Sequence, residues 1–414
     1  MNKRIPLITL ATAGVLVLAA CASSGSPSGG STSGGSGSGD SSPIKIGIVT
    51  PLSGAYGSEG QEEVRGMQLA LKANGNKVGN HPVTLVTADG FVANDAIAAV
   101  DRLVSQEHVN IITGTYATPT SLAGSQEAAK LNVPWIETSA ITDSLTQRGL
   151  DTYIRTGARA FDFASASADF LIKGLGSKVD SKSVYIDAEN GPYGTAVEQT
   201  QVSKLKAAGW KVGQGSHASA ATDVTDSVLA AKNAKPAVWL LTGYNPDLTL
   251  LLRTAAAQNF KPQAIVLTGA GDAQSVYQAV GAKDLTGTFV VAYSSLIESP
   301  KYAPGMAKYY KAYKAKYNSE PLGTVSATAY TGMTAVLEII KAAGGKTDTQ
   351  SIKAASLKVD VPFGGLPNGW GLQIDQQGQN QRIELTTVQW RSDGTLPAVW
   401  PTKAVKTGEK LELK

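Results

Sequence analysis

Residues 43–74 read PIKIGIVTPLSGAYGSEGQEEVRGMQLALKAN, and this stretch decides the fold. Residues 44–49 form a short run rich in β-branched side chains, which predicts a buried parallel strand. Residues 50–60 predict a loop of small residues, and the apolar side chains of residues 64–71 recur at helical spacing. In open α/β sheets, ligands bind just beyond the carboxyl ends of the strands. The loop is therefore a candidate wall of a binding site, with an ordinary surface loop as the alternative.

The same strand–loop–helix pattern recurs along the rest of the chain. Further strands are predicted at residues 83–86, 109–112, 133–136, 153–155, 183–187, 237–241 and 264–267, with helical patterns between them. Such alternation is typical of parallel sheets covered by helices on both faces. We therefore predict an α/β fold with two doubly wound, Rossmann-like lobes and a ligand cleft at their junction.

Polar loops follow the predicted strands. In the first half, residues 113–119 and 137–143 offer hydroxyl groups and backbone N–H groups at helix starts, which is the chemistry of an anion site. Thr118 is expected to be the N-cap of a helix over residues 119–131. The alternative is that Thr118 and Ser139 serve only as caps. In the second half, Tyr193 and Tyr244 follow strands, and half-buried rings with solvated hydroxyl groups are the alternative there.

The first 42 residues are not expected to belong to the fold. Residues 1–20 carry two basic residues before an apolar run, which is typical of a secretory signal. Residues 18–21, Leu-Ala-Ala-Cys, resemble a bacterial lipoprotein cleavage box, and Cys21 is the one cysteine of the chain. This resemblance implies lipid (palmitate) on Cys21 and a membrane anchor facing the extracytoplasmic side. A cleaved, freely secreted protein is the alternative. Residues 22–42 are almost all Ser and Gly and predict a flexible linker.

Composition argues against several function classes. The formal net charge is only +4 over 414 residues, and no Lys/Arg cluster suggests nucleic-acid binding. The three histidines stand apart, so no metal site is expected, and no cofactor motif is present. The spacing of Gly54, Gly57 and Gly60 resembles a phosphate loop, but no Walker sequence follows. Ser203 and Lys206 resemble a penicillin-binding motif but fall in the middle of a predicted helix. We expect no enzymatic activity.

Several motifs together resemble the leucine/isoleucine/valine-binding family of ABC importers. They comprise residues 46–48, 53–57, 191–194, 242–247, 375–380 and 388–390. The resemblance implies the type I periplasmic-binding fold, whose two lobes are joined by three hinge crossings. We place these near Gly157, Val291 and Gly365. Lobe 1 then comprises residues 43–157 and 291–364, and lobe 2 comprises residues 158–290 and 365–414.

The resemblance also implies the site. In that family, a ligand carboxylate is held by two loops that match residues 116–118 and 139–141, and aromatic residues of the second lobe close over it. An acidic residue that pairs with the ligand's ammonium group follows the strand matching residues 264–267. Here Thr268–Gly271 carries no charge, so Glu137 or Asp272 would have to replace it. The expected ligand-binding residues are Tyr56, Tyr116, Thr118, Ser139, Ala140, Ile141, Tyr193, Tyr244, Ala270 and Asp272.

The function that follows is capture of a small molecule outside the cytoplasm. We expect a monomeric solute-binding lipoprotein that delivers a small carboxylate or amino-acid-like ligand to an ABC permease and ATPase complex. The alternative is a ligand sensor whose closed form is presented to a membrane signalling partner. Branched-chain amino acids, other carboxylates, amides and aromatic acids all remain open as ligands.

Overall fold

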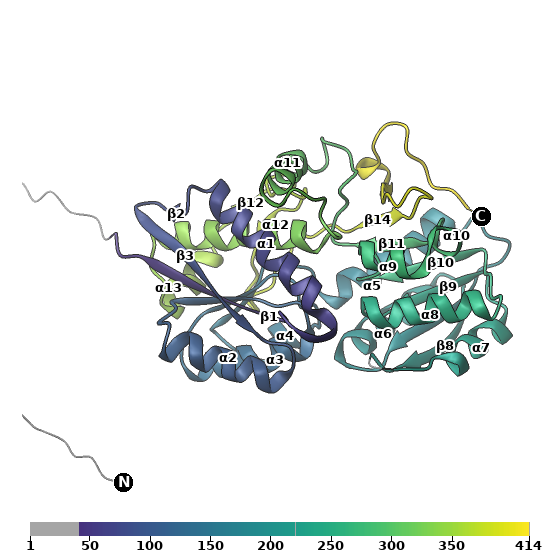
Figure 1. Cartoon of the computed structure of the whole chain (residues 1–414), viewed down its shortest axis with the longest axis horizontal. Helices are drawn as coiled ribbons and strands as arrows, with labels where there is room; N and C mark the ends of the chain where they lie inside the picture. Colours follow the sequence, from purple (N-terminus) through teal and green to yellow (C-terminus); the bar gives the residue numbers. More distant parts are fainter. Residues whose placement is uncertain (1–40, 220, 414) are drawn as a thin grey trace, which may run out of the picture. The chain divides into compact units, whose positions relative to one another are not determined.

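The computed structural model of the chain describes residues 41–219 and 221–413. The predicted signal segment 1–20, Cys21 and most of the linker 22–42 lie outside these residues. The described part contains two α/β lobes, each built on its own sheet (Figure 1).

Lobe 1 is built on a sheet with the strand order β2-β3-β1-β4-β5-β6. Neighbouring strands are parallel except for β2, which pairs antiparallel with β3. The loops that follow β1, β4 and β5 therefore meet at one edge of the sheet. The strands are β1 (Ile44–Thr50), β2 (Lys77–Val78), β3 (His81–Asp89), β4 (Ile111–Gly114), β5 (Trp135–Glu137) and β6 (Tyr153–Arg155).

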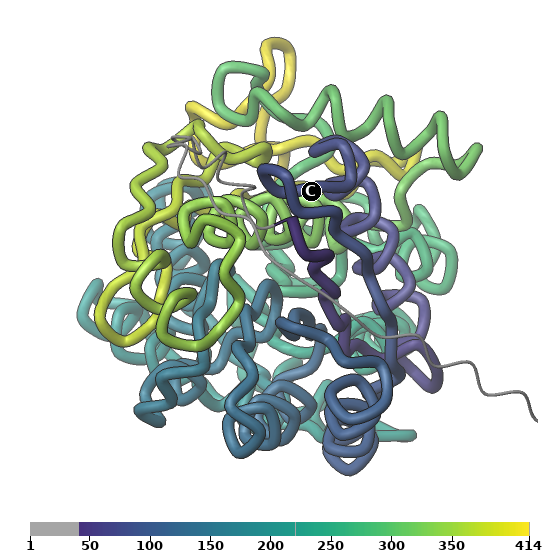
Figure 2. The backbone as a smooth tube through the Cα atoms, turned by 90° about the vertical axis from the view of Figure 1, so that its left-hand side faces the viewer, coloured from purple at the N-terminus to yellow at the C-terminus, as the bar shows by residue number. Residues whose placement is uncertain are grey.

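Helices cover both faces of the lobe 1 sheet. Ile46 and Ile48 of β1 pack in one apolar cluster with Met67 of α1, whereas Val49 packs with Val100 of α2 in another. Figure 2 shows β1, in dark purple, running through the middle of the lobe above the blue helices. The helices of this lobe are α1 (Gly57–Ala73), α2 (Ala93–Ser105), α3 (Thr118–Lys130), α4 (Ser144–Gln147), α11 (Met306–Tyr317), α12 (Val325–Ala342) and α13 (Thr349–Ser356).

Lobe 2 repeats this plan with the strand order β15-β14-β11-β10-β9-β7-β8. Strands β7 to β11 pair in parallel, and β14 and β15 extend the sheet in antiparallel fashion. The prediction of two doubly wound α/β lobes is thus confirmed. The strands are β7 (Ser183–Glu189), β8 (Lys211–His217), β9 (Val238–Thr242), β10 (Ala264–Thr268), β11 (Phe289–Ala292), β14 (Thr386–Gln389) and β15 (Ala398–Trp400).

The lobe 2 helices bury alternate residues of the central strand β9. Trp239 and Leu241 belong to the cluster that includes Leu248 of α8, whereas Leu240 faces the cluster that includes Val197 of α6. Helix α5 continues as a π-helical segment at Phe170–Leu175. The helices are α5 (Ala160–Asp169), α6 (Pro192–Ala207), α7 (Thr225–Ala234), α8 (Asn245–Ala257), α9 (Gln274–Val280) and α10 (Ala282–Leu285).

The chain passes between the lobes three times. Strand β6 ends at Arg155 in the lobe 1 sheet, and α5 already packs in lobe 2, which fits the crossing expected near Gly157. Strand β11 belongs to the lobe 2 sheet and ends at Ala292, so we place the second crossing, expected near Val291, just after this residue. The hairpin of β12 (Asp360–Val361) and β13 (Leu372–Gln373) precedes β14, the next strand of lobe 2. We therefore place the third crossing between residues 380 and 386, not near Gly365.

Two local expectations about the cleft edge are wrong. The loop after β1 is shorter than residues 50–60, because α1 already begins at Gly57. A Cβ atom at Gly60 would lie 1.7 Å from the Pro51 carbonyl oxygen, so glycine lets α1 pack tightly against the end of β1. Helix α3 begins at Thr118 with Ala117 as its N-cap, so Thr118 is not the cap. The Thr118 side chain is thereby left for another role.

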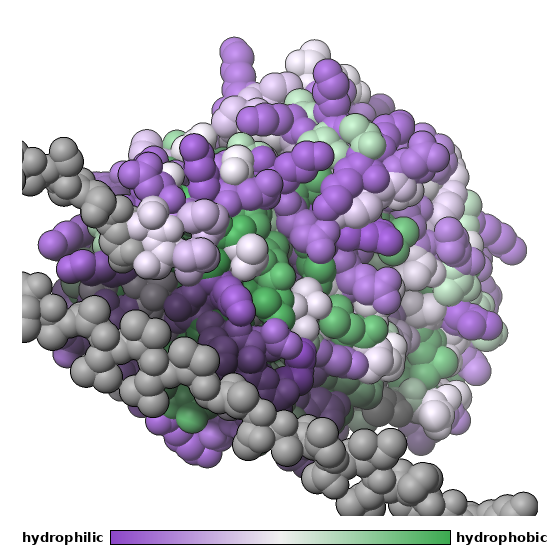
Figure 3. All heavy atoms as spheres, turned by 60° about the vertical axis from the view of Figure 1, so that its left-hand side comes forward, coloured by the Kyte–Doolittle hydropathy of each residue, from purple (hydrophilic) through white to green (hydrophobic). Residues whose placement is uncertain are grey.

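The face drawn in Figure 3 is largely hydrophilic, with hydrophobic residues visible at its centre. Large hydrophobic side chains that are strongly exposed come from separate segments of the described chain. Isolated exposed side chains of this kind are normal for soluble domains. They are Val92, Leu131, Phe161, Leu322 and Phe363. Within residues 41–219 and 221–413, no helix is both long and apolar enough to cross a membrane.

Candidate functional site

A small cavity lies where the strand-end loops of the two lobes meet. The space within it is about 20 Å³, close to what one water molecule needs. A small organic ligand therefore requires the lobes or their side chains to move apart. The residues that line the cavity are Tyr116, Thr118, Ser139, Ile141, Tyr193, Gly243, Tyr244, Gly269, Ala270 and Tyr293.

Tyrosine rings from both lobes form the wall of the cavity. The ring of Tyr244 lies 5.0 Å from that of Tyr56, 6.0 Å from that of Tyr116 and 5.1 Å from that of Tyr193, measured between centroids. Burial raises the pKa of Tyr56 to about 12 and raises the pKa of the other three rings well above 10. Their hydroxyl groups are therefore neutral and can donate hydrogen bonds, as Tyr193 does to the Thr268 carbonyl at 2.6 Å.

Most of the predicted site residues come together, and three lie apart from the cavity lining. Tyr56 contacts the cluster through its ring contacts with Tyr116 and Tyr244. Ala140 does not line the cavity, and its N–H donates to Glu137 Oε1 at 3.0 Å. Asp272 accepts hydrogen bonds from the N–H and the hydroxyl of Thr324, at the start of α12.

Glu137 places a buried carboxyl group beneath the lobe 1 loops. Its side chain is fully buried and absent from the cavity wall. Glu137 Oε1 accepts from the backbone N–H groups of Thr115, Thr138, Ser139 and Ala140, and Oε2 accepts from Ser121 Oγ and Trp135 Nε1. Burial raises the pKa of Glu137, and these hydrogen bonds oppose that rise. Glu137 therefore organises the two loops that follow β4 and β5 and has no oxygen to spare for an ammonium group.

Arg155 joins the same loops to the hinge. Its Nη1 donates to the carbonyl oxygens of Ala140 and Thr142 at 3.2 and 2.8 Å, and its Nε donates to Gln379 Oε1 at 2.6 Å. The side chain is fully buried. Burial lowers the pKa of this guanidinium, but an arginine stays charged in proteins. Arg155 therefore links the segment at Gln379 directly to the loop that carries Ser139.

No lining residue, all of them in the described part of the chain, carries a carboxylate. The acidic groups nearby have partners of their own. Glu59 Oε1 accepts from Asn245 Nδ2 at 2.7 Å, across the two lobes, and Asn245 Oδ1 accepts from the Gly271 N–H. Glu189 Oε2 accepts from the Gly194 N–H at 2.8 Å. An ammonium group in this cavity would have no adjacent counter-charge.

A buried histidine supports the Tyr244 loop from behind. His217 Nδ1 lies 2.8 Å from Asp187 Oδ1, and Nε2 lies 2.9 Å from Asp247 Oδ2. Asp247 Oδ1 in turn accepts from the Tyr244 N–H at 3.0 Å. Burial lowers the pKa of His217, but its bonds to the two carboxylates outweigh this and raise it to about 9. The charged ring thus lies between two carboxylates and helps to hold Tyr244 at the cavity.

The sequence of the chain matches the periplasmic binding protein family over residues 43–395. The chain belongs to this family. Among its relatives, the Leu/Ile/Val-binding protein homolog 7 of Brucella suis is 33% identical over 372 residues, which cover 88% of this chain and 93% of that protein. The predicted family resemblance is confirmed.

Two solved structures illustrate the range of ligands among proteins with this fold. The branched-chain amino acid transporter substrate binding protein of Streptococcus pneumoniae, in complex with isoleucine, superimposes with a TM-score of 0.75 at 20% identity, covering 88% of this chain and 99% of that one. A solute binding protein of an R. palustris ABC transporter, in complex with 4-hydroxybenzoate, gives 0.76 at 20% identity, covering 90% and 97%. At 20% sequence identity, these two comparisons show that the fold is shared and do not identify the ligand of this chain.

Sequence reasoning missed two residues at the cleft of this periplasmic binding protein. Tyr293 follows β11 and donates its hydroxyl hydrogen to the Ser139 carbonyl oxygen at 2.6 Å. Its position directly after a strand end was the available signal. Glu63, on α1, lies fully buried beside the Ser139 hydroxyl group. A glutamate on a helix with many polar neighbours gives no sign in the sequence that it points inward.

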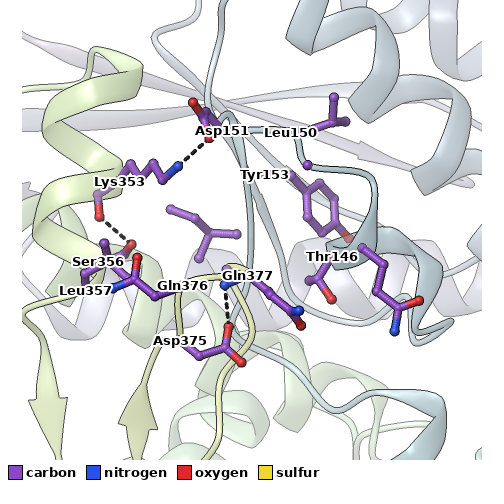
Figure 4. Close-up of a pocket in the computed structure, with 14 residues that line it drawn as sticks. Thr146, Leu150, Asp151, Tyr153, Lys353, Ser356, Leu357, Asp375, Gln376 and Gln377 are labelled. Carbon is purple, nitrogen blue, oxygen red and sulfur yellow. Dashed lines mark hydrogen bonds and ion pairs between the residues drawn. The ribbon is translucent and has the colours of Figure 1, made fainter.

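A second cavity of this periplasmic binding protein, of about 270 Å³, lies apart from the cleft (Figure 4). It is enclosed by the α4–β6 region, α13 and the turn of residues 375–378. Its one lysine, Lys353, already forms an ion pair with Asp151, and Asp375 Oδ1 accepts from the Gln377 N–H at 2.9 Å. With its charges satisfied internally, we do not assign this cavity to a ligand.

Proposed function

We propose that this protein captures a small carboxylate between its lobes and delivers it to an ABC importer, and that the rest of the ligand carries no positive charge. One observation carries the proposal: the cavity wall offers hydroxyl donors and aromatic rings but no carboxylate. Thr118 and Ser139 of lobe 1 and the hydroxyl groups of Tyr116 and Tyr244 supply donors for an anion. Tyr116, Tyr193 and Tyr244 supply ring faces for an aliphatic or aromatic body.

Closure of the lobes is the step that a permease would recognise. A ligand that contacts both lobes shifts the equilibrium toward the closed form. The closed form is held by contacts from opposite lobes, such as Asn245 to Glu59 and Thr142 Oγ1 to the Pro192 carbonyl at 3.3 Å. The relatives named above include proteins described as Leu/Ile/Val-binding homologs and a 4-hydroxybenzoate complex. Both amino acids and aromatic acids are therefore the relevant test ligands.

A calorimetric panel of four ligands tests the proposal. We expect leucine to bind at least about a hundredfold more weakly than its 2-keto and 2-hydroxy analogues or 4-hydroxybenzoate, because a buried ammonium without a counter-charge costs several kcal/mol. Tight binding of leucine with much weaker binding of the other three would contradict the proposal. It would mean that a carboxylate such as Glu59 turns toward the ligand.

Two matched variants place the bound carboxylate. Thr118→Val removes one hydroxyl from the cavity wall at nearly constant volume and should weaken the tightest ligand by about ten- to a hundredfold. Thr334→Val removes a hydroxyl that is bonded within its own helix, to the Tyr330 carbonyl, and should leave affinity unchanged. Unaltered affinity in a folded Thr118→Val protein would show that the ligand lies elsewhere.

We also propose that lipid on Cys21 anchors the protein on the extracytoplasmic side of the membrane. Cys21→Ser should abolish lipid attachment, because the hydroxyl of serine cannot take the place of the acceptor thiol. The protein would then accumulate as unprocessed precursor or be released into the medium, which fractionation and mass spectrometry of the N-terminus would detect. Unchanged membrane retention with a mature end elsewhere would refute the anchor.

A further inference from the structure

Glu63 is a buried acid next to the candidate ligand-binding loop. It lies on α1, its side chain is fully buried, and its Oε2 accepts a hydrogen bond from the Thr50 hydroxyl. The Ser139 hydroxyl lies close enough to the carboxyl to act on it as a hydrogen-bond partner. Neither Glu63 Oε1 nor Ser139 Oγ, both buried, makes a hydrogen bond of good geometry within the protein. Ser139 also lines the cavity.

The other polar atoms of Ser139 are engaged. Its N–H donates to Glu137 Oε1 at 3.0 Å, and its carbonyl oxygen accepts from the Tyr293 hydroxyl at 2.6 Å. The side-chain hydroxyl of Ser139 can therefore donate its hydrogen either to the Glu63 carboxyl group or to a ligand atom in the cavity. A hydroxyl group has a single hydrogen to donate. Its direction therefore depends on whether Glu63 carries a proton.

The protonation state of Glu63 decides whether Ser139 offers a ligand the lone pair or the hydrogen of its hydroxyl group. An ionised Glu63 can only accept, so the Ser139 hydrogen points toward it and a lone pair faces the cavity. A protonated Glu63 can donate to Ser139 Oγ, which frees the serine hydrogen for a ligand oxygen. A ligand carboxylate, which only accepts, is compatible with the second arrangement alone. Its negative charge would further disfavour an ionised Glu63 close by.

We propose that Glu63 sets the direction of the Ser139 hydroxyl and thereby couples the capture of a carboxylate to the uptake of one proton. This inference rests on the proposed function, since it concerns the same cavity and the same class of ligand. It adds that affinity is higher on the acidic side of neutrality and that Glu63 is a positioning residue acting through Ser139.

The electrostatic surroundings place this coupling near neutral pH. Burial raises the pKa of Glu63 to about 7, the hydrogen bonds with Ser139 and Thr50 act against that rise, and the charge of Glu137 adds to it. Tyr293 also faces Glu63, and burial raises its pKa far above neutrality, so it does not titrate in the same range. The pKa of His217 in lobe 2 is about 9. Burial also raises the pKa of Glu137, but the hydrogen bonds that it accepts oppose this rise. Glu63 is therefore the acid beside Ser139 that we assign to a charge change between pH 6 and 8.

Calorimetry on the wild-type protein tests the coupling without any substitution. Titration of the same four compounds between pH 6 and pH 8 should show affinity for a bound carboxylate falling by about tenfold, as expected for one linked proton. Repeating the titration at pH 7 in phosphate and in Tris, whose ionisation enthalpies differ, should reveal net proton uptake on binding. Binding that is independent of pH and releases or absorbs no proton would overturn the inference.

Two variants test whether Glu63 is the residue that takes up the proton. Glu63→Gln is an isostere of the protonated acid, because its amide can donate to Ser139 and accept from Thr50. It should keep the affinity measured at pH 6, lose the dependence on pH to within about twofold and take up no proton. Ser139→Ala should also abolish the dependence on pH, with weaker binding throughout.

Glu298→Gln is the matched control. Glu298 is another buried acid whose pKa burial raises, to about 8, but it does not line the cavity. Its substitution should leave the pH profile of binding intact. A Glu63→Gln protein that retains the wild-type profile would overturn the inference while the proposed function stands. If none of the four compounds binds at any pH, the proposed function itself fails and the coupling falls with it.

Discussion

Replacing Glu137 with glutamine is expected to lower the free energy of unfolding by about 3–5 kcal/mol, as breaking a buried charged network commonly does. The carboxylate accepts from four backbone N–H groups through one oxygen and from Ser121 and Trp135 through the other. In glutamine the second position is an NH₂ group, which donates. The Trp135 N–H would then face another donor, and the four amides would face a neutral oxygen.

Urea unfolding followed by circular dichroism measures this loss. Glu338→Gln serves as the control, since Glu338 is substantially exposed and lies 3.6 Å from Lys341 on the outer surface of α12. Such a surface pair contributes about 0–1 kcal/mol. If Glu137→Gln changed stability as little as this control, the carboxyl group would be protonated in the native protein. Burial would then outweigh the donated hydrogen bonds in setting its pKa.

Replacing Glu137 should also lower the affinity for the ligand. The N–H groups of Ser139 and Thr138 donate to one Glu137 oxygen, and Ser139 lines the cavity. We expect weaker ligand binding in the folded fraction of Glu137→Gln, whereas Glu338→Gln should bind as the wild type does. The sequence predicted an anion site formed by the backbone N–H groups of residues 113–119 and 137–143. In the structure, the Glu137 carboxylate accepts from four of these N–H groups. In the function proposed above, the ligand's own anion would lie further out, against the hydroxyl groups that line the cavity.

Sequence patterns predicted the elements well where packing is repetitive. A β-branched run such as residues 44–49 is buried on both faces in any parallel sheet, so strand β1 and its neighbours follow from local composition. The boundaries depended on contacts that the sequence does not display. Helix α1 starts at Gly57 because the absence of a side chain at Gly60 lets it approach Pro51. The third crossing comes late because β14 pairs with β11, a partner far away in sequence.

The sequence predicted which loops line the candidate site, but it did not predict the hydrogen bonds and charges around it. Loops at strand ends must converge in a doubly wound fold, so Thr118, Tyr193 and Tyr244 could be selected from their positions alone. The sequence does not show the direction in which each side chain points. Trp135, Ile136 and Glu137 are all buried in β5, so alternation along the strand does not show that Glu137 turns inward. Whether an acid faces a ligand or a backbone loop is settled by tertiary contacts.

Stability should also depend on pH through His217, at the opposite side of the cleft. Both ring nitrogens face carboxylates, which only the charged imidazolium can satisfy with two donated hydrogen bonds. Because the pKa of His217 in the folded protein is about 9, above the ordinary 6.5, this contribution is complete below about pH 6.5. It is lost as the pH rises through 9. The shift corresponds to roughly 3 kcal/mol of unfolding free energy.

His217→Gln is expected to remove this contribution completely. The unfolding free energy at neutral pH should fall by about 3–5 kcal/mol, because Asp187 and Asp247 would face each other without a cation. The difference between wild type and variant, measured by urea unfolding from pH 6 to pH 10, should narrow as wild-type His217 loses its proton. His108→Asn, at an exposed position with φ of +53° that asparagine tolerates, should change stability by no more than about 0.5 kcal/mol. A constant difference across the whole range would mean that His217 is neutral in the native protein. The Tyr244 loop would then be held by Asp247 alone.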